Sequence, residues 1–446
     1  MSTARNRMRA VIVGLGRTGI SCARYLHERG WQLAVTDTRT EPPALAELRA
    51  LDATIPVSLG ALDARLLKDA MCVVASPGVS LDQPFFAEAR RLGLEVVGDI
   101  ELFARAANAP VVGITGTNGK STVTTLVGRM AARAGLTVRV GGNLGAPALE
   151  LLSAEAELYV LELSSYQLET TESLHCQAAT VLNVSPDHLD RYADVCAYAA
   201  AKARIFARCD TAVINLDDPL VVAMPRAAAR TLSFSLRAAI GADYAIARSA
   251  GEWWLTRREE PLLPLAAMRI RGLHNAANAL AALALGEALG LPLPAMLEEL
   301  RSFEGLAHRS QWVADIAGVH YVDDSKGTNV GATLAAVAGM DGPLVMILGG
   351  DGKNQDFAPL GAAFRGKVRH AVLIGRDAAL LERALTGVCP LSRATTLPAA
   401  VAAAAAAAQP GDTVLLSPAC ASLDMFRDYA HRGAVFAQAV RELAAA

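Results

Sequence analysis

Short runs of β-branched and other apolar residues alternate with helical stretches over the first hundred residues. Strand-like runs occur at RAVIVG (9–14), WQLAVTD (31–37) and CVVASPG (72–78). Helical patterns lie between them at ISCARYLHERG (20–30) and near residues 82–92. This alternation predicts βαβ units built on a parallel sheet.

The same alternation starts again twice further along the chain. A second set of strand-like runs is VVGITG (111–116), LYVLELS (158–164), TVLNVS (180–185) and TAVINLDD (211–218), with helices from Ser121 and Asn275. A third set is VHYVDDS (319–325), PLVMILGG (343–350), HAVLIGRD (370–377) and TVLLSPA (413–419), with helices from Asn329, through the alanine tract ending at Gln409, and at the end. We expect three α/β domains at 1–98, 99–305 and 306–446, each with a parallel sheet. The first and last are predicted to be Rossmann-like.

Composition and charge restrict the class of protein. Hydrophobic residues make up 52% and charged residues 19%, with a formal charge of −2, so no global basic field favours nucleic acid. Seven scattered cysteines without a CxxC pair signal neither disulfides nor zinc, which fits a reducing cytoplasm. The first apolar run is one strand long, unlike a signal peptide, and no run reaches the roughly 18 residues that cross a bilayer. We expect a cytoplasmic monomer without membrane or nucleic-acid partners.

A first glycine-rich loop opens the chain. Gly14, Gly16 and Gly19 follow a strand-like run and precede a helical one, and Asp37 ends the next strand-like run. Such a loop brings backbone amides and a helix N-terminus to an anion, and the acid lies where a ribose-binding residue belongs. NAD(P) and a uridine diphosphate both suit this loop, and a ligand-free tight turn is the structural alternative.

A second glycine-rich loop, GTNGKST, spans residues 116–122 between a strand-like run and a helix. In such loops the lysine pairs with the terminal phosphates of a nucleoside triphosphate and the hydroxyl ligates Mg²⁺. The loop departs from the strict pattern because Ile114 stands six residues before Lys120. The strand, loop and helix context nevertheless predicts ATP with Mg²⁺, on a central sheet of the P-loop ATPase type.

Polar residues follow several other predicted strands. Glu162 ends one strand, where a magnesium ligand would lie. His188 follows another and suits a loop hydrogen bond as well as a metal ligand. Lys202 reads as an ordinary solvated helix lysine. Clusters at 274–278, 308–309, 324–329, 349–354 and 417–426 suit caps and turns, or loops facing a shared cleft.

Taken in order along the whole chain, these motifs resemble the Mur ligase family, ATP-dependent enzymes that add amino acids to the peptidoglycan precursor. The shared segments are GLGRTG, DTR, SPG, TGTNGKST, GGNLG, ELSSYQLE, DHLDRY, HN, HR, DDSKGTN, GGDGK and SPACASLD.

The resemblance implies a role for each matched residue. It implies a UDP-sugar site at Gly16, Arg17, Thr18, Asp37, Thr38, Arg39, Gly78, Asn143, Ser164 and Gln167. It implies an ATP site at Gly116, Thr117, Asn118, Gly119, Lys120, Ser121, Thr122, Asn278, Arg309 and Asp324. It implies catalytic roles for Lys120, Glu162, His188 and Lys202, with magnesium at Ser121, Glu162, His188 and a carbamylated Lys202. It implies D-glutamate binding by Thr328, Lys353, Ser422, Leu423 and Tyr429, the last where the family often has phenylalanine.

The implied reaction joins D-glutamate to UDP-N-acetylmuramoyl-L-alanine through an acyl phosphate formed from ATP, and it serves cell-wall synthesis. The two phosphate loops would then serve different nucleotides. Alternatives are a sibling ligase for L-alanine or a diamino acid, a folylpolyglutamate-type synthetase, or an NAD(P)-dependent dehydrogenase or sensor. The second phosphate loop argues against the dehydrogenase and the sensor.

Overall fold

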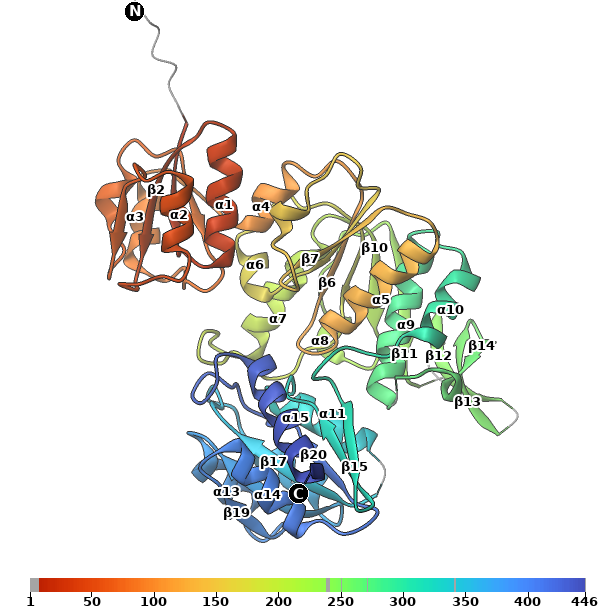
Figure 1. Ribbon diagram of the computed structural model, residues 1–446. Coiled ribbons are helices and arrows are strands. Elements are labelled where there is room, and N and C mark those ends of the chain that lie inside the picture. Colours follow the sequence, from red (N-terminus) through yellow and green to blue (C-terminus); the bar gives the residue numbers. More distant parts are fainter. Residues whose placement is uncertain (1–7, 238–240, 250, 271, 341, 446) are drawn as a thin grey trace, which may run out of the picture.

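The computed structural model describes residues 8–237, 241–249, 251–270, 272–340 and 342–445. Three sheets occupy successive parts of the chain, and helices cover them, so the protein forms a first, a central and a C-terminal domain (Figure 1). The central domain touches both of the others.

The first domain confirms the predicted βαβ pattern. Its elements are β1 (Arg9–Val13), α1 (Arg17–Glu28), β2 (Gln32–Asp37), α2 (Leu45–Leu51), β3 (Val57–Leu59), β4 (Cys72–Ala75), α3 (Pro84–Arg91) and β5 (Glu95–Val97). The strands are parallel in the order β3-β2-β1-β4-β5. Strand order reverses between β1 and β4, so the loops after them diverge and leave a crevice. Gly14 begins the first of these loops with φ +88°, and a Cβ there would lie 2.9 Å from Cβ of Ser76, so only glycine fits.

The central domain carries nine strands in the order β14-β13-β12-β11-β10-β9-β6-β8-β7. The strands are β6 (Val111–Thr115), β7 (Val138–Gly142), β8 (Leu158–Glu162), β9 (Cys176–Val181), β10 (Cys209–Asn215), β11 (Arg230–Ser235), β12 (Tyr244–Ser249), β13 (Glu252–Arg257) and β14 (Glu260–Pro264). The helices are α4 (Asp99–Ala104), α5 (Lys120–Arg133), α6 (Ser165–Glu169), α7 (Val195–Ala203), α8 (Pro219–Val222), α9 (Leu273–Ala288) and α10 (Leu293–Ser302).

Two sequence predictions for this domain need correction. The sheet is not wholly parallel, because β13 pairs antiparallel with β12 and with β14. The strand predicted at 180–185 spans Cys176–Val181 instead. Asn183, beyond its end, bonds the phosphate loop: its carbonyl accepts from Thr117 N at 2.9 Å and its Oδ1 from Asn118 N at 2.9 Å. The residues after Val181 therefore include one that hydrogen-bonds the phosphate loop, and they do not extend strand β9.

The C-terminal domain has six strands in the order β15-β16-β20-β17-β18-β19. They are β15 (Gln311–Ile316), β16 (Val319–Asp323), β17 (Leu344–Gly349), β18 (Val368–Ile374), β19 (Leu391–Arg393) and β20 (Thr413–Leu416). The helices are α11 (Val330–Gly339), α12 (Ala358–Phe364), α13 (Ala378–Leu385), α14 (Leu397–Ala407) and α15 (Tyr429–Ala445). The alanine tract forms α14 as predicted. Sequence reasoning missed β15, which pairs antiparallel with β16.

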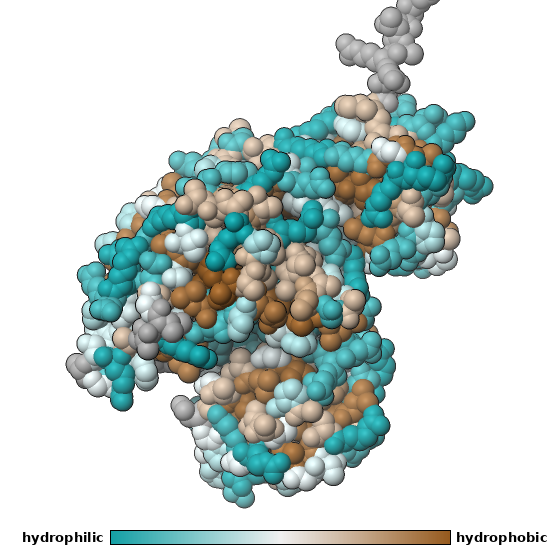
Figure 2. Space-filling view, turned by 180° about the vertical axis from the view of Figure 1, so that it is seen from behind, coloured by the Kyte–Doolittle hydropathy of each residue, from teal (hydrophilic) through white to brown (hydrophobic). Residues whose placement is uncertain are grey.

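The first and central domains share a hydrophobic core cluster. One continuous cluster of buried residues runs from Ile12 of β1 through Ile100 and Phe103 of α4 to Tyr159 and Ile205 of the central domain. Within the described ranges no helix is long and apolar enough to cross a membrane. Hydrophilic and hydrophobic residues are interspersed over the face seen in Figure 2.

Candidate active site

Three cavities lie along the carboxyl ends of the strands, and they collect most of the predicted site residues. The first, about 510 Å³, lies between the first and central domains. Nine of the ten residues predicted for the UDP-sugar line it: Gly16, Arg17, Thr18, Asp37, Thr38, Arg39, Gly78, Asn143 and Gln167. The tenth, Ser164, lines the neighbouring third cavity.

Asp37 organises the mouth of this first cavity. Its Oδ2 accepts from Leu15 N and from Arg39 Nη2, both at 2.7 Å, and its Oδ1 accepts from Arg39 Nε at 2.9 Å. Burial alone would raise the pKa of Asp37, but the hydrogen bonds from Arg39 hold it below its ordinary value. The carboxylate therefore stays charged and fixes the Arg39 guanidinium at the cavity.

The phosphate loop connects β6 to the N-terminus of α5. Gly119 precedes the helix with φ +85°, and a Cβ there would lie 2.4 Å from Oδ1 of Asn278, so glycine is needed. Lys120 Nζ donates to the carbonyls of Gly116 at 2.8 Å and Thr117 at 2.9 Å. Arg309 Nη2 donates to Ser121 Oγ at 2.7 Å, which joins the start of the C-terminal part to the loop. Cations and helix amides thus converge where a polyphosphate would lie.

A second cavity, about 380 Å³, extends from this loop between the central and C-terminal domains. Asn278, Arg309 and Asp324, the three residues predicted to hold the nucleotide beyond the phosphate loop, all line it. Asp324 accepts from Ser310 N at 3.0 Å and from Ser417 Oγ at 2.7 Å. Burial raises the pKa of Asp324 to about 7.

The third cavity, about 260 Å³, is lined by all four predicted catalytic residues, Lys120, Glu162, His188 and Lys202, and is called the reaction-centre cavity below. Glu162 ends β8 as predicted, and its Oε1 accepts from Asn143 Nδ2 at 2.7 Å. Its buried Oε2 has no hydrogen-bond partner within the described part of the chain. Burial would raise the pKa of Glu162, but Lys120 and its hydrogen bonds hold it below the ordinary value. An unpartnered buried carboxylate oxygen facing a cavity is suited to a cation.

His188 adopts a left-handed backbone conformation, φ +57°, and lines the cavity. The ring meets Tyr166 edge to face at 5.1 Å and Tyr198 at 6.0 Å. Desolvation lowers the pKa of His188 to about 4, although Asp187 Oδ2 lies 3.8 Å from its Nε2, so the imidazole is neutral at physiological pH, the form that binds metals.

Lys202 corrects the interpretation made from its own sequence context, because it is 1% exposed rather than solvated. Its Nζ donates to the Gly116 carbonyl at 3.0 Å and lies 4.3 Å from the centre of the Tyr198 ring. Burial first, and then the charge of Lys120, hold the pKa of Lys202 well below its ordinary value. A helix pattern alone could not reveal this, since burial of α7 depends on the sheet it packs against.

Only some of the residues predicted to bind D-glutamate lie together at one cavity. Thr328 and Lys353 line the reaction-centre cavity. Ser422, Leu423 and Tyr429 are not among the side chains lining it in the described structure. Leu423 is 71% exposed, and the Tyr429 ring lies 4.0 Å from Nζ of Lys326, a cavity residue.

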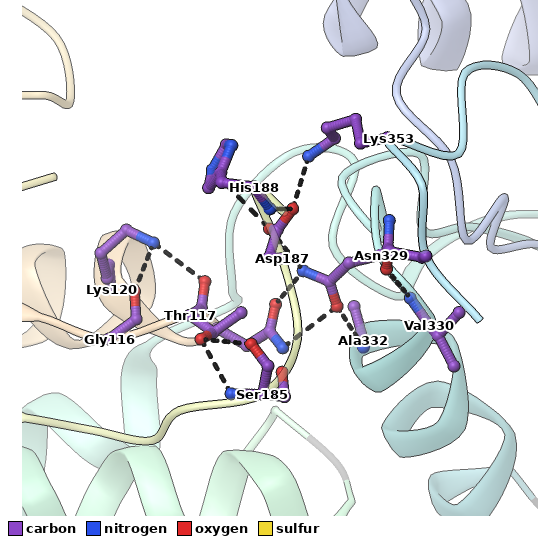
Figure 3. A network of polar contacts seen from close by, with 12 residues as sticks. Gly116, Thr117, Lys120, Ser185, Asp187, His188, Asn329, Val330, Ala332 and Lys353 are labelled. Carbon is purple, nitrogen blue, oxygen red and sulfur yellow. Dashed lines mark hydrogen bonds and ion pairs between the residues drawn. The ribbon is translucent and has the colours of Figure 1, made fainter. Parts of the chain in front are cut away.

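A polar network that the sequence did not reveal crosses from the central to the C-terminal domain (Figure 3). Asp187 Oδ1 accepts from Lys353 Nζ at 2.7 Å and its Oδ2 from Asn329 Nδ2 at 3.1 Å. Asn329 Nδ2 also donates to Asn118 Oδ1 at 3.2 Å, while its own Oδ1 caps α11. The PDH and KGTN segments were the available signals, but both read equally well as local turns.

Comparison with known proteins identifies the family. Three domain profiles match in order: the Mur ligase MurD-like N-terminal domain over residues 8–98, the Mur ligase middle domain over 114–286, and the Mur ligase glutamate ligase domain over 308–420. The chain belongs to the Mur ligase family, which confirms the resemblance seen in the sequence.

Several curated relatives share one name. The chain is 52% identical over 438 residues to the UDP-N-acetylmuramoylalanine--D-glutamate ligase of Methylococcus capsulatus, covering 98% of this chain and 95% of that protein. It is 51% identical to the ligase of the same name from Pseudomonas aeruginosa, with 97% and 98% covered.

Solved structures share the fold. A UDP-N-acetylmuramate-alanine ligase from Thermotoga maritima has a TM-score of 0.62 at 19% identity, with 98% of this chain and 100% of that one covered. A pseudomurein peptide ligase type C from Methanothermus fervidus has a TM-score of 0.59 at 17% identity, with 98% and 100% covered. The predicted three-domain α/β fold is thereby confirmed.

Proposed function

We propose that this protein joins D-glutamate to UDP-N-acetylmuramoyl-L-alanine and converts ATP to ADP and phosphate, a step of peptidoglycan precursor synthesis in the cytoplasm on which wall growth, cell shape and division depend. The observation that carries the proposal is identity above 50% across nearly the whole chain with relatives named for this activity. The site supports it, because two separate phosphate-binding loops open into adjoining cavities.

The UDP-sugar would lie in the first-domain cavity. The Gly16 to Thr18 loop and the N-terminus of α1 offer amides to its diphosphate, and Arg39, held by Asp37, adds a positive charge. Asn143 lies where this cavity meets the reaction centre. The alanyl carboxylate would therefore extend from the first domain toward Lys120.

ATP would lie across the second and third cavities, with its phosphates on the loop at 116–122. A carboxylate is a poor electrophile, and transfer of the γ-phosphoryl group to it supplies a leaving group. Lys120 and Arg309 would offset charge on the transferring group, since both are held at the loop by hydrogen bonds. The amine of D-glutamate then attacks the acyl phosphate, and the amide forms as phosphate leaves.

Magnesium fits the donor set at this centre. Ser121, Glu162 and His188 would hold it, and the free Oε2 of Glu162 together with the neutral imidazole of His188 support this assignment. Bound Mg²⁺ would offset phosphate charge during transfer. Among the described residues no group of three or more histidine, cysteine, aspartate and glutamate side chains converges on one point. A carbamate on Lys202 would supply the missing carboxylate, and its neutral amine is the form that reacts with carbon dioxide.

Lys353 would receive a carboxylate of D-glutamate, with Thr328 beside it, and the loop of Ser422 and Leu423 and the Tyr429 ring would complete the amino-acid site as the C-terminal domain closes. Closure would also exclude water from the acyl phosphate. We propose that the protein acts as a monomer.

The test is ADP release by the purified protein with UDP-N-acetylmuramoyl-L-alanine, ATP and Mg²⁺, in parallel reactions with D-glutamate, L-glutamate, L-alanine, L-lysine and meso-diaminopimelate. We expect turnover with D-glutamate alone. Turnover with another amino acid would assign the chain to a sibling ligase, and tight NADH binding without any turnover would favour the dehydrogenase or sensor alternative.

A further inference from the structure

Arg191 lies in the loop after β9, three residues beyond His188, and its side chain reaches the first domain. Its Nη1 donates to the Pro77 carbonyl at 2.8 Å, and its Nη2 donates to the Val79 carbonyl at 3.4 Å. These two carbonyls flank Gly78 in the loop after β4, and all three residues line the first-domain cavity. The Arg191 side chain is 14% exposed, so the link is shielded from water, where charge-assisted hydrogen bonds are strongest.

The same guanidinium is also attached to the central domain. Its Nη2 donates to Glu169 Oε2 at 3.0 Å, and its Cζ lies 4.0 Å from the centre of the Tyr166 ring. Tyr192 OH donates to the other oxygen of Glu169 at 2.5 Å, which holds that carboxylate in place. The Tyr166 ring in turn packs edge to face on His188. A single aromatic ring therefore separates Arg191 from the imidazole at the reaction centre.

A guanidinium is planar and donates in fixed directions, so it cannot follow a moving carbonyl without changing its position over the ring it stacks on. A shift of the loop at residues 77–79 would consequently move Arg191 against Tyr166 and, through it, His188. We propose that Arg191 is a positioning residue that couples ligand binding in the first-domain cavity to the placement of His188 at the reaction centre. This inference rests on the proposed function, because it takes the UDP-sugar as the ligand of the first domain and magnesium with ATP as the ligands of the reaction centre.

Coupling of this kind is reciprocal, so it can be measured as binding. If Arg191 transmits it, magnesium and nucleotide at the reaction centre should raise the affinity of the first domain for its UDP-sugar by the same factor as the UDP-sugar raises theirs. If Arg191 only stabilised the fold, its replacement would lower the free energy of unfolding and leave this factor unchanged.

The chain offers a matched control in Arg204. Its Nε donates to the Leu168 carbonyl at 2.7 Å and its Nη2 to the Thr171 carbonyl at 2.9 Å. Arg204 thus holds two backbone carbonyls beside α6, as Arg191 holds two in the first domain, but both of its partners lie within the central domain.

The experiment is calorimetric titration of UDP-N-acetylmuramoyl-L-alanine into the full-length protein, with and without saturating Mg²⁺ and a non-hydrolysable ATP analogue. We expect the additions to raise the affinity of the wild type about tenfold, within the usual range of such coupling. Arg191→Met should bring the ratio of the two affinities close to unity, whereas Arg204→Met should keep the wild-type ratio. Arg191→Lys, which retains the charge but not the fork, should give an intermediate ratio.

A wild-type ratio in Arg191→Met would overturn the proposal, as would a wild-type protein whose affinity does not respond to the additions. Circular dichroism checks folding, and if the methionine variant does not fold, the lysine variant decides by the same ratio. Absence of any UDP-sugar binding by the wild type would instead contradict the proposed function itself, so the two failures are distinct.

Discussion

Lys353 of the C-terminal domain and Asp187 of the central domain form an ion pair, with Nζ 2.7 Å from Oδ1. Their side chains are only 14% and 7% exposed, so removal of either residue would leave the opposite charge buried without its counter-charge. Burial would raise the pKa of Asp187, but the charge of Lys353 holds it below its ordinary value. The pair therefore holds the two domains together at the reaction centre and keeps an ammonium group beside the place proposed for D-glutamate.

Replacement of Lys353 tests the amino-acid site. We expect Lys353→Met to raise the KM for D-glutamate about tenfold to a hundredfold, because a charge-assisted hydrogen bond contributes roughly 1.5–3 kcal/mol. The KM for ATP should change much less. Steady-state ADP release with each substrate varied gives both values. Lys367→Met, at the opposite end of the same sheet, is the control, and an unchanged KM for D-glutamate in Lys353→Met would remove Lys353 from the amino-acid site.

Lys120 is expected to be essential for turnover but not for folding. Lys120→Ala removes a cation from the phosphate loop, and loss of one such electrostatic contact costs about 10²–10³-fold in kcat. The thermal unfolding curve should stay close to that of the wild type, because among the described residues Lys120 Nζ donates to two carbonyls of its own loop and to no other domain. Lys68→Ala, an exposed lysine of the first domain, serves as the comparison. Full activity in Lys120→Ala would contradict the assignment of this loop to ATP binding.

Carbamylation of Lys202 can be tested without relying on activity. We expect the wild-type protein equilibrated with ¹³C-labelled bicarbonate to show a carbamate carbon signal by NMR, and Lys202→Ala to lack it. Activity lost in Lys202→Ala should return in part when short carboxylates are added, since they can occupy the space left by the side chain. A spectrum that is the same in both proteins would argue against the carbamate, and failure of rescue would count against its role at the metal.

The half-buried imidazole of His188 predicts a pH effect on stability. Its pKa is about 4 in the folded protein and near 6.5 when unfolded, so between these values the unfolded chain binds more protons. The contribution of His188 to stability therefore rises with pH from about 4 to about 6.5 and is lost as pH falls through this window. We compare the free energy of unfolding of His188→Gln with that of the wild type at each pH. The difference should favour the variant by on the order of 2 kcal/mol more at pH 4 than at pH 7.

Chemical denaturation of both proteins across this pH range measures the effect. His27→Gln, a histidine on α1 in the first domain, controls for the loss of a histidine as such. If the stability difference between wild type and His188→Gln were independent of pH, the ring would not be buried in its neutral form.

Sequence patterns predicted those features that depend on neighbouring residues. The strands ending at Val13, Thr115 and Glu162 and the loops that follow them were found because glycine, lysine and hydroxyl residues have strong local preferences there. The antiparallel pairing of β13 with β12 and β14 was missed. Residue patterns identify a strand but do not show whether it pairs parallel or antiparallel with its neighbours.

Features that depend on packing could not be predicted in the same way. Arg432, fully buried in α15, donates to the carbonyls of Ser325 at 2.8 Å and Cys420 at 3.1 Å, yet its sequence context is that of a surface helix. Lys202 was misread for the same reason, since the period of a helix does not tell which face is covered.

The sequence by itself determined the order of the motifs, the two glycine-rich loops and the family, because a loop of fixed backbone geometry needs particular residues at adjacent positions. Only the tertiary structure decided which charges meet. Asp187 and Lys353 are 166 residues apart, and Arg191 and Pro77 are 114 apart, so each contact exists only once separate domains have docked. The burial that lowers the pKa values of Lys202 and His188 likewise belongs to the assembled protein, because desolvation depends on everything packed around a group and not on its neighbours in the chain.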